Sequence, residues 1–327
     1  MSLASPATFR QGIYKNRGVR RIAQWLDAMP NPPLGVEIGV NRLGAVRWAH
    51  DGSVDDVVIE PLPPGAIVPS AIETNLVNAD ALRTAFSNVF RRLGAKDEDL
   101  AMLLPDPVIR VFVQHFEEFP RSPQEALPML RWKLKKSVPF GVDETVLSYM
   151  RQAPQEGGVD VLTAFARLGI VREYEELAES VGLRPGVILS SSLAAVALLE
   201  EHNVTMLARV SDTVLTTAIV RDGVLCGYRC TELPVRGCDL TPQMLLEEIF
   251  PAAVYYRDIW HEGIQSIKVA GLSARLPEFV ELLQSEFQCP VKSLLQSALS
   301  DGRIPEDAKA LADRELEGLT GWTMNRG

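Results

Sequence analysis

The chain contains the same three-strand pattern twice, and this duplication constrains its fold more than any other feature. Residues 34–64 alternate short apolar runs with turns, one at Asp51-Gly52, and predict three strands joined as a meander. Residues 205–234 repeat the pattern with a turn at Asp222-Gly223. Helical periodicity follows each meander, over 79–93 and 241–260. Two such copies predict an α/β protein with mixed sheets, built as two lobes with a cleft between them.

Size and composition agree with a soluble protein of more than one lobe. The 327 residues are 46% hydrophobic and 23% charged, which is ordinary for a globular chain. No run approaches the length of a membrane span, and the N-terminus lacks the apolar core of a secretory signal. The net charge of −9 argues against nucleic-acid binding, because phosphate contacts need a cationic surface. The sequence therefore predicts a cytoplasmic protein without a nucleic-acid partner.

Cysteine, histidine and serine patterns predict neither a metal site nor a nucleophile. Cys226 and Cys230 are separated by three residues, but no second close pair follows, so the four cysteines are interpreted as buried free thiols. The four histidines have no close spacing. The serines at 190–192 precede a helix and are predicted to cap it, since no Gly-x-Ser-x-Gly elbow is present.

Residues 1–33 are predicted to form an N-terminal amphipathic extension. Apolar residues at helical spacing lie beside three arginines: Val19, Ile22, Ala23 and Leu26 with Arg17, Arg20 and Arg21. A basic amphipathic helix suits an anionic membrane surface, and it equally suits packing against the body of the protein. Packing is the preferred interpretation, and the sequence leaves both open.

Residues 103–149 predict a strand, a basic amphipathic helix and a second strand. Positions 110–116 alternate two unlike faces, as a strand does. From Pro123, the apolar positions Leu127, Leu130 and Leu134 alternate with four cations, Arg131, Lys133, Lys135 and Lys136. Pro139 is expected to end the helix, because proline donates no backbone hydrogen bond. Strands at 145–151 and 159–166 and a helix at 171–181 follow.

The order of these motifs resembles the PilM family, the cytoplasmic actin-like proteins of type IV pilus assembly. The Leu-Pro-Asp element at 104–106, the Val-Pro-Phe segment at 138–140 and the string Glu-Thr-Val-Leu-Ser-Tyr at 144–149 stand in the family's order. Matching segments at 61–67, 247–258 and 318–326 extend the resemblance over residues 34–326. The resemblance implies an actin-like ATPase fold, related to FtsA: two duplicated RNase H-like lobes with a small inserted α/β subdomain.

The resemblance also implies domain boundaries. The first actin-like lobe is expected over 34–107 and 183–202, and the inserted SHS2-like subdomain over 108–182. The second lobe is expected over 203–327.

Three loops that hold nucleotide in this family are altered here. Residues 37–44 read Glu-Ile-Gly-Val-Asn-Arg-Leu-Gly, where the family usually has Asp-Ile-Gly-Ser-Ser-Ser-x-Lys. Residues 207–213 contain no acidic-x-Gly pair, and either Arg209 or Asp212 faces the cleft or is a surface charge. The adenosine turn at 269–277 keeps one glycine, and Leu272 is expected where adenine would lie. Each change removes a contact to ATP.

The resemblance implies six candidate positions for ATP and Mg²⁺: Glu37, Gly39, Asn41, Asp212, Gly271 and Ser273. Three altered loops together favour weak or absent ATP binding, and we assign no catalytic residue. The expectation is a pseudo-ATPase. One alternative keeps an active actin-like ATPase or sugar kinase, with Glu37 organising Mg²⁺ and Asp212 activating the nucleophile.

The resemblance implies a scaffold at the cytoplasmic face of the inner membrane. There it would bind the cytoplasmic N-terminal tail of a PilN-like inner-membrane protein, together with other pilus assembly proteins, in a groove between the first lobe and the inserted unit. Candidate groove residues are Val111, Val113, Val138, Pro139 and Phe140, for which core packing is the competing interpretation. The basic helix face suits lipid headgroups or solvent. A cytoplasmic component of a type II secretion system is a further alternative.

Overall fold

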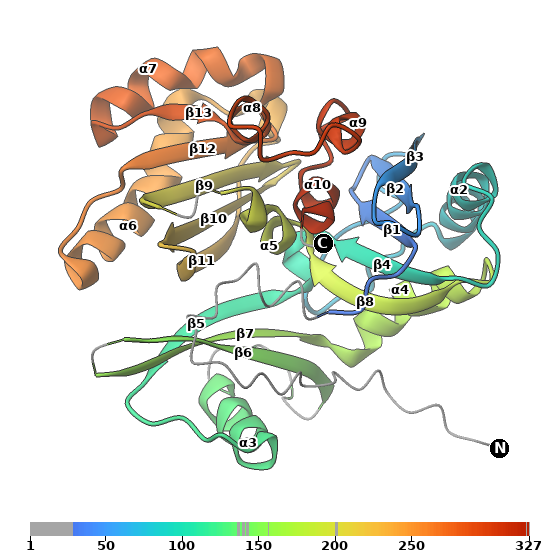
Figure 1. Cartoon of the computed structure of the whole chain (residues 1–327), viewed down its shortest axis with the longest axis horizontal. Helices are drawn as coiled ribbons and strands as arrows, with labels where there is room; N and C mark the ends of the chain where they lie inside the picture. Colours follow the sequence, from blue (N-terminus) through green and yellow to red (C-terminus); the bar gives the residue numbers. More distant parts are fainter. Residues whose placement is uncertain are drawn as a thin grey trace.

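The computed structural model describes residues 29–135, 138, 141, 144–155, 157–199, 202–324 and 326. They form three sheets, of which two belong to the upper lobes and the third to a smaller unit beneath them (Figure 1). Among the described helices, none combines the length and the apolar character needed to cross a bilayer. The predicted helix within residues 1–33 and the stop at Pro139 lie outside the described residues.

The first lobe is built on a sheet with strand order β3-β2-β1-β4-β8. Its strands are β1 (Leu34–Ile38), β2 (Arg42–Trp48), β3 (Val54–Pro61), β4 (Asp99–Leu104) and β8 (Arg184–Ser190). Strand β1 runs antiparallel to β2 and parallel to β4, and β4 runs parallel to β8. Every residue of β1 is buried, as expected of an apolar strand in the middle of a sheet. Helix α2 (Ala79–Arg92) contacts β2 and β3.

The second lobe repeats this topology with strand order β11-β10-β9-β12-β13. Its strands are β9 (Val204–Ser211), β10 (Val214–Arg221), β11 (Val224–Glu232), β12 (Ser266–Ala270) and β13 (Val291–Ser293). The meander is again antiparallel, and β9, β12 and β13 are parallel. Helices α6 (Pro242–Trp260) and α7 (Leu276–Phe287) complete this lobe. The duplication predicted from the two meanders is confirmed.

The inserted unit is an antiparallel sheet with one helix. Its sheet order is β5-β7-β6, with β5 (Arg110–Phe116), β6 (Thr145–Gln155) and β7 (Gly158–Arg167). Strands β6 and β7 are longer than predicted because they meet at a tight hairpin, where Gly157 adopts a φ of +88°. Helix α3 (Pro123–Leu134) shares a small core with the sheet through Ala126 and Leu130.

Helix α4 (Leu168–Glu179) differs from the sequence expectation. It begins three residues before the predicted 171, and it packs against α2 and β8 of the first lobe. Its buried Ile170 and Tyr174 belong to the main core, which contains residues of the first lobe and of the inserted sheet, and the Tyr174 hydroxyl lies 3.1 Å from Asn75 Oδ1. Helix α4 also contacts β7, so it connects the inserted unit to the first lobe.

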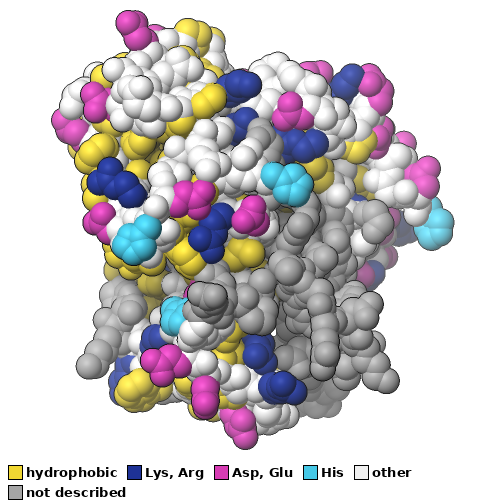
Figure 2. Space-filling view, turned by 60° about the vertical axis from the view of Figure 1, so that its left-hand side comes forward, with side chains coloured by type: hydrophobic (Ala, Val, Ile, Leu, Met, Phe, Trp, Pro, Cys, Tyr) yellow, Lys and Arg dark blue, Asp and Glu magenta, His cyan; other side chains and the backbone are white. Residues whose placement is uncertain are grey.

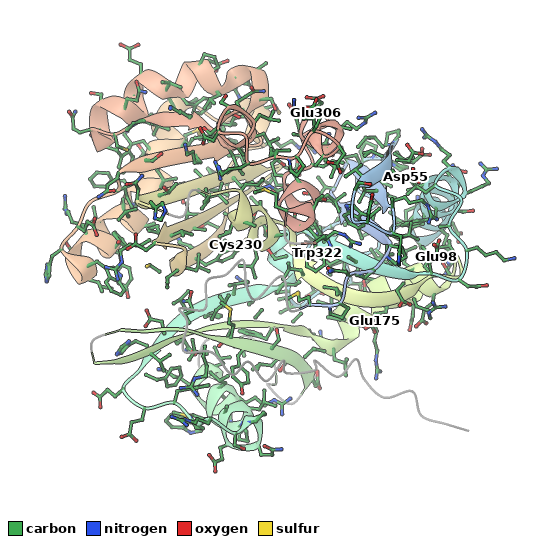
Figure 3. All side chains as sticks on the ribbon, in the orientation of Figure 1. Asp55, Glu98, Glu175, Cys230, Glu306 and Trp322 are labelled. Carbon is green, nitrogen blue, oxygen red and sulfur yellow. The ribbon has the colours of Figure 1, made fainter. Side chains whose placement is uncertain are left out.

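The C-terminal helices contact elements of both lobes. Helices α8 (Leu294–Ser300), α9 (Lys309–Ala312) and α10 (Glu317–Thr323) contribute to the main core, which contains residues of both lobes. Trp322, only 1% exposed, lies where the lobes meet (Figure 3). Trp48 Nε1 donates to Thr323 Oγ1 at 3.1 Å. Helix α10 thus packs on α5 and β1 of the first lobe, whereas α8 packs on β12 and β13 of the second.

Candidate functional site

A cleft of about 290 Å³ opens between the lobes. It is formed by the β1–β2 turn, the β9–β10 turn, the turn after β12 and the residues before and at the start of α10. Five of the six predicted cofactor residues line it, and Ser273 does not; the five are Glu37, Gly39, Asn41, Asp212 and Gly271. The structure thus brings the predicted turns together, while ligand binding by these residues stays a prediction.

The guanidinium of Arg209, at the end of β9, lies at the base of this cleft. Its side chain is 10% exposed, and Nη2 donates to Glu37 Oε1 at 2.8 Å and to Glu317 Oε2 at 3.4 Å. Its Nη1 lies 3.3 Å from Ser192 Oγ and 3.7 Å from Asp106 Oδ2. One cation of the second lobe therefore binds three carboxylates that pack with the first.

Glu37 is already engaged by protein donors. Its Oε1 accepts from Arg209 and from the Ser191 hydroxyl, and its Oε2 accepts from the Leu319 backbone N–H at 3.0 Å. The side chain is 7% exposed. Protein donors thus occupy three of about four lone pairs of this carboxylate, which leaves it poorly available to hydrated Mg²⁺, the role that the kinase alternative requires.

Asp106 forms a second buried junction between the lobes. Its carboxylate accepts from the Ser190 hydroxyl at 2.6 Å, from the Ser192 N–H at 2.9 Å and hydroxyl, and from Thr216 Oγ1 of β10 at 2.7 Å. Ser190 also lies 2.9 Å from the Tyr228 hydroxyl. A buried carboxylate is tolerated because every lone pair has a donor.

Helix α5 (Ser191–Ala195) explains why three serines stand in a row. Ser190 caps it by accepting from the Leu193 N–H, as predicted. Ser191 and Ser192 have a further role that sequence analysis missed, since their hydroxyls donate to Glu37 and Asp106. The only sequence signal for this role was three consecutive small polar residues at the start of an apolar helix.

Electrostatics maintain this arrangement. Burial alone lowers the pKa of Arg209, but the attraction of Glu317, Glu37 and Asp106 outweighs it, so the pKa is raised and the cation is permanent. Burial raises the pKa of Glu317, with repulsion from Glu37 adding to this effect and Arg209 opposing it. Burial also raises the pKa of Tyr228, which keeps its hydroxyl protonated beside Asp106.

The two turns of the second lobe that line the cleft have specific backbone requirements. Gly271 has a φ of +77°, and a Cβ there would lie 1.8 Å from the Val210 carbonyl oxygen, so only glycine fits. Asp212 adopts a φ of +51°, which aspartate tolerates in a turn without glycine. Leu272 is 5% exposed within the second lobe's core. The expectation that its side chain occupies the adenine position is therefore wrong.

The residues present do not fit Mg-ATP. Four carboxylates line the cleft, those of Glu37, Asp212, Glu315 and Glu317, against the two cations Arg42 and Arg209. Arg42 is committed to the carbonyls of Arg314 and Glu315, at 3.1 and 2.6 Å. A triphosphate would meet more negative than positive charge in this cleft. The cleft volume of about 290 Å³ is also slightly below that of typical ligand pockets, which is about 300–1,000 Å³. Within the described ranges, no cluster of His, Cys, Asp and Glu is arranged to hold a metal.

The predicted groove residues occupy mixed environments. Val111 is 6% exposed and belongs to the main core, which supports core packing for this residue. Val113 packs half-buried against that core, and Val138 is half-buried. Pro139 and Phe140 lie outside the described residues.

Comparisons with known proteins bear on the fold. No family profile and no curated protein matches the sequence. Among solved structures, a chain of a PilM–PilN type IV pilus biogenesis complex superposes with a TM-score of 0.67 at 17% identity, covering 90% of this chain and 98% of that one. A Bacteroides thetaiotaomicron protein of unknown function with an actin-like ATPase fold gives 0.51 at 10% identity, covering 86% and 95%. The chain has the actin-like ATPase fold.

The likeness to PilM expected from the motifs is confirmed at the level of the fold. The actin-like fold also accounts for the inter-lobe cleft and for the shared topology of the two sheets. The cytoplasmic domain of EpsL, an inner membrane component of the type II secretion system of Vibrio cholerae, is less similar. Its TM-score is 0.46 at 10% identity, covering 73% of this chain and 82% of that one, which is too low to bear on function.

Proposed function

We propose that the protein is a PilM-like scaffold of type IV pilus assembly that works without nucleotide chemistry. It would bind the N-terminal tail of a PilN-like protein at the cytoplasmic face of the inner membrane. The likeness to a chain of the PilM–PilN complex over 98% of that chain supports this role. The cleft in which Arg209 pairs with Glu37 and Glu317 supports the absence of nucleotide.

The observation that carries the proposal is the outer edge of β6. In the sheet order β5-β7-β6, no described strand pairs with that edge, whereas β5 lies against β11. Val146 of β6 is 43% exposed. Val146 lies opposite Ala166 of β7, and Arg167 is the next residue of that strand. The Arg167 guanidinium donates to the Ile72 carbonyl at 2.7 Å and forms an ion pair with Glu144. The exposed Ile72 of the first lobe therefore lies near this edge.

An extended tail suits this junction for a physical reason. A peptide that adds a strand to β6 gains main-chain hydrogen bonds, and its apolar side chains gain contact with Val146 and Ile72. The edge belongs to the inserted unit and Ile72 to the first lobe, so a tail bound at this edge would lie between the two. The half-buried Val113 and Val138 remain the other candidate contacts.

We expect a cognate PilN-like tail peptide to bind the full chain, measured by calorimetry. Val146→Asp should weaken this binding at least tenfold, because a buried charge replaces an apolar contact. Ile259→Asp is the matched control, since Ile259 is 49% exposed on α6 of the other lobe. Lack of binding by the native chain, or equal weakening by both substitutions, would count against the proposal.

We expect no Mg-ATP binding up to millimolar nucleotide, measured by the same calorimetry. The reason is the excess of carboxylates in the cleft and the commitment of Arg42 and Arg209 to protein acceptors. Measured heats that fit a micromolar dissociation constant for Mg-ATP would contradict the proposal that the protein works without nucleotide. The tail-binding part would then be measured with and without nucleotide.

A further inference from the structure

We propose that α3 is a docking surface for anionic lipid headgroups. This helix lies at the outer end of the inserted unit, on the side of its sheet away from the two lobes (Figure 1). A flat membrane can therefore approach α3 without meeting either lobe. The proposal is independent of the tail-binding junction at β6.

Trp132 of α3 is an exposed aromatic residue. Its side chain is 77% exposed, more than any other large hydrophobic side chain in the described part of the protein. The core of the inserted unit uses Ala126 and Leu130 of α3, and Leu134 is buried too, so folding does not require an indole on the opposite face. Tryptophan is enriched at membrane–water interfaces, where its ring is apolar and its N–H is polar.

Cations flank Trp132 in the sequence. Lys133 and Lys135 are exposed and Arg131 is half-buried, while Glu125, near the other end, is the one acidic residue of α3. Lys133 Nζ donates to the His115 carbonyl at 3.0 Å and lies 3.8 Å above the Phe116 ring, which fixes its position. The chain as a whole carries a net charge of −9. A cationic helix end on an acidic protein is complementary to an anionic surface.

The chemistry favours lipid over an acidic protein partner. Lysine is depleted in protein–protein interfaces but suits headgroups, because its stem lies along apolar surface while the ammonium stays in water. The helix lies at the edge of the molecule, where a plane can approach it (Figure 1). The lower part of the molecule in Figure 2 carries acidic as well as basic side chains, so the contact is expected to be local and reversible.

The test is vesicle flotation of the full chain. One set of vesicles contains phosphatidylcholine alone, and the other replaces one third of it with phosphatidylglycerol. The native chain should float with the anionic vesicles only and be released by high salt. Trp132→Ser should reduce binding severalfold. Lys135→Glu should reduce it by roughly 25-fold, since each charge near such a surface is worth about fivefold.

Two controls make the result decisive. Tyr255→Ser removes an aromatic side chain that is 69% exposed on α6, and it should leave flotation unchanged. Both α3 variants should bind the tail peptide as the native chain does, which separates this proposal from the scaffold function. Failure of the native chain to float, or undiminished flotation of the α3 variants, would overturn it. Undiminished flotation of the α3 variants would assign the membrane contact to another segment, such as residues 1–33. Binding of an acidic protein without binding of vesicles would also overturn the lipid proposal.

Discussion

Replacing Arg209 with methionine is expected to lower the free energy of unfolding by about 3–5 kcal/mol, the usual cost of removing one partner from a buried ion pair. Methionine keeps most of the side-chain volume but leaves Glu37 and Glu317 buried without their cation. The Coulomb attraction across the lobes is lost, while the cost of burying the carboxylates remains. Urea or guanidinium unfolding of the two chains measures the difference directly.

The pH dependence of this variant separates loss of charge from loss of packing. In the native chain, burial raises the pKa of Glu317 and Arg209 opposes the rise, so the methionine variant should raise this pKa further. A carboxyl with a raised pKa binds protons more tightly in the folded than in the unfolded state. Its contribution is therefore present at low pH and is lost as the pH rises through the folded pKa. The loss in free energy of unfolding caused by Arg209→Met should therefore be small at acidic pH and large near neutrality.

Arg83→Met is the matched control for Arg209. Arg83 of α2 pairs with Asp80 at 3.0 Å, but the two side chains are 57% and 94% exposed. Exposed pairs contribute at most about 1 kcal/mol, because water screens them. Similar losses for Arg83→Met and Arg209→Met, or a deficit independent of pH, would show that Arg209 does not join the lobes electrostatically.

Gly321→Ala is expected to destabilise the protein by about 3 kcal/mol, at the upper end of the cost of overpacking. Gly321 lies in α10 where this helix crosses α5, and a Cβ there would stand 2.3 Å from the Ala194 carbonyl oxygen and 3.0 Å from Ala195 Cα. Both are backbone atoms, so no side-chain rotation relieves the clash. The helices must separate, and the separation moves Glu317 and the Leu319 N–H away from Arg209 and Glu37.

Gly169→Ala is the matched control in α4. Its added Cβ would have no neighbour within 4 Å, and its φ lies outside the left-handed region. Alanine should stabilise this position by about 0.4–1 kcal/mol, because it restricts the unfolded chain. Thermal and denaturant unfolding of both variants would compare the two effects. A Gly321→Ala chain within 0.5 kcal/mol of the native one, on the order of an ordinary surface change, would contradict the packing account of α10.

The local structure of this protein could be predicted from its sequence. The two meanders, the strands of the inserted unit and the Ser190 cap follow from patterns within windows of a few residues. The glycine kept at 271 marked a turn that admits no side chain. The likeness to PilM rested on the order of such local motifs, and the fold comparison agrees with it.

The tertiary structure decided which distant groups meet. Arg209 is separated from Glu37 by 172 positions and from Glu317 by 108, so no periodicity links them. For the same reason the sequence left Arg209 either in the cleft or on the surface. It placed α4 and the C-terminal helices by position along the chain, whereas their packing partners, α2 and β8 for α4 and α5 for α10, became visible only in the tertiary structure. Hydrogen-bond and ion-pair partners depend on where whole elements pack, and the sequence pattern of any one element does not specify that.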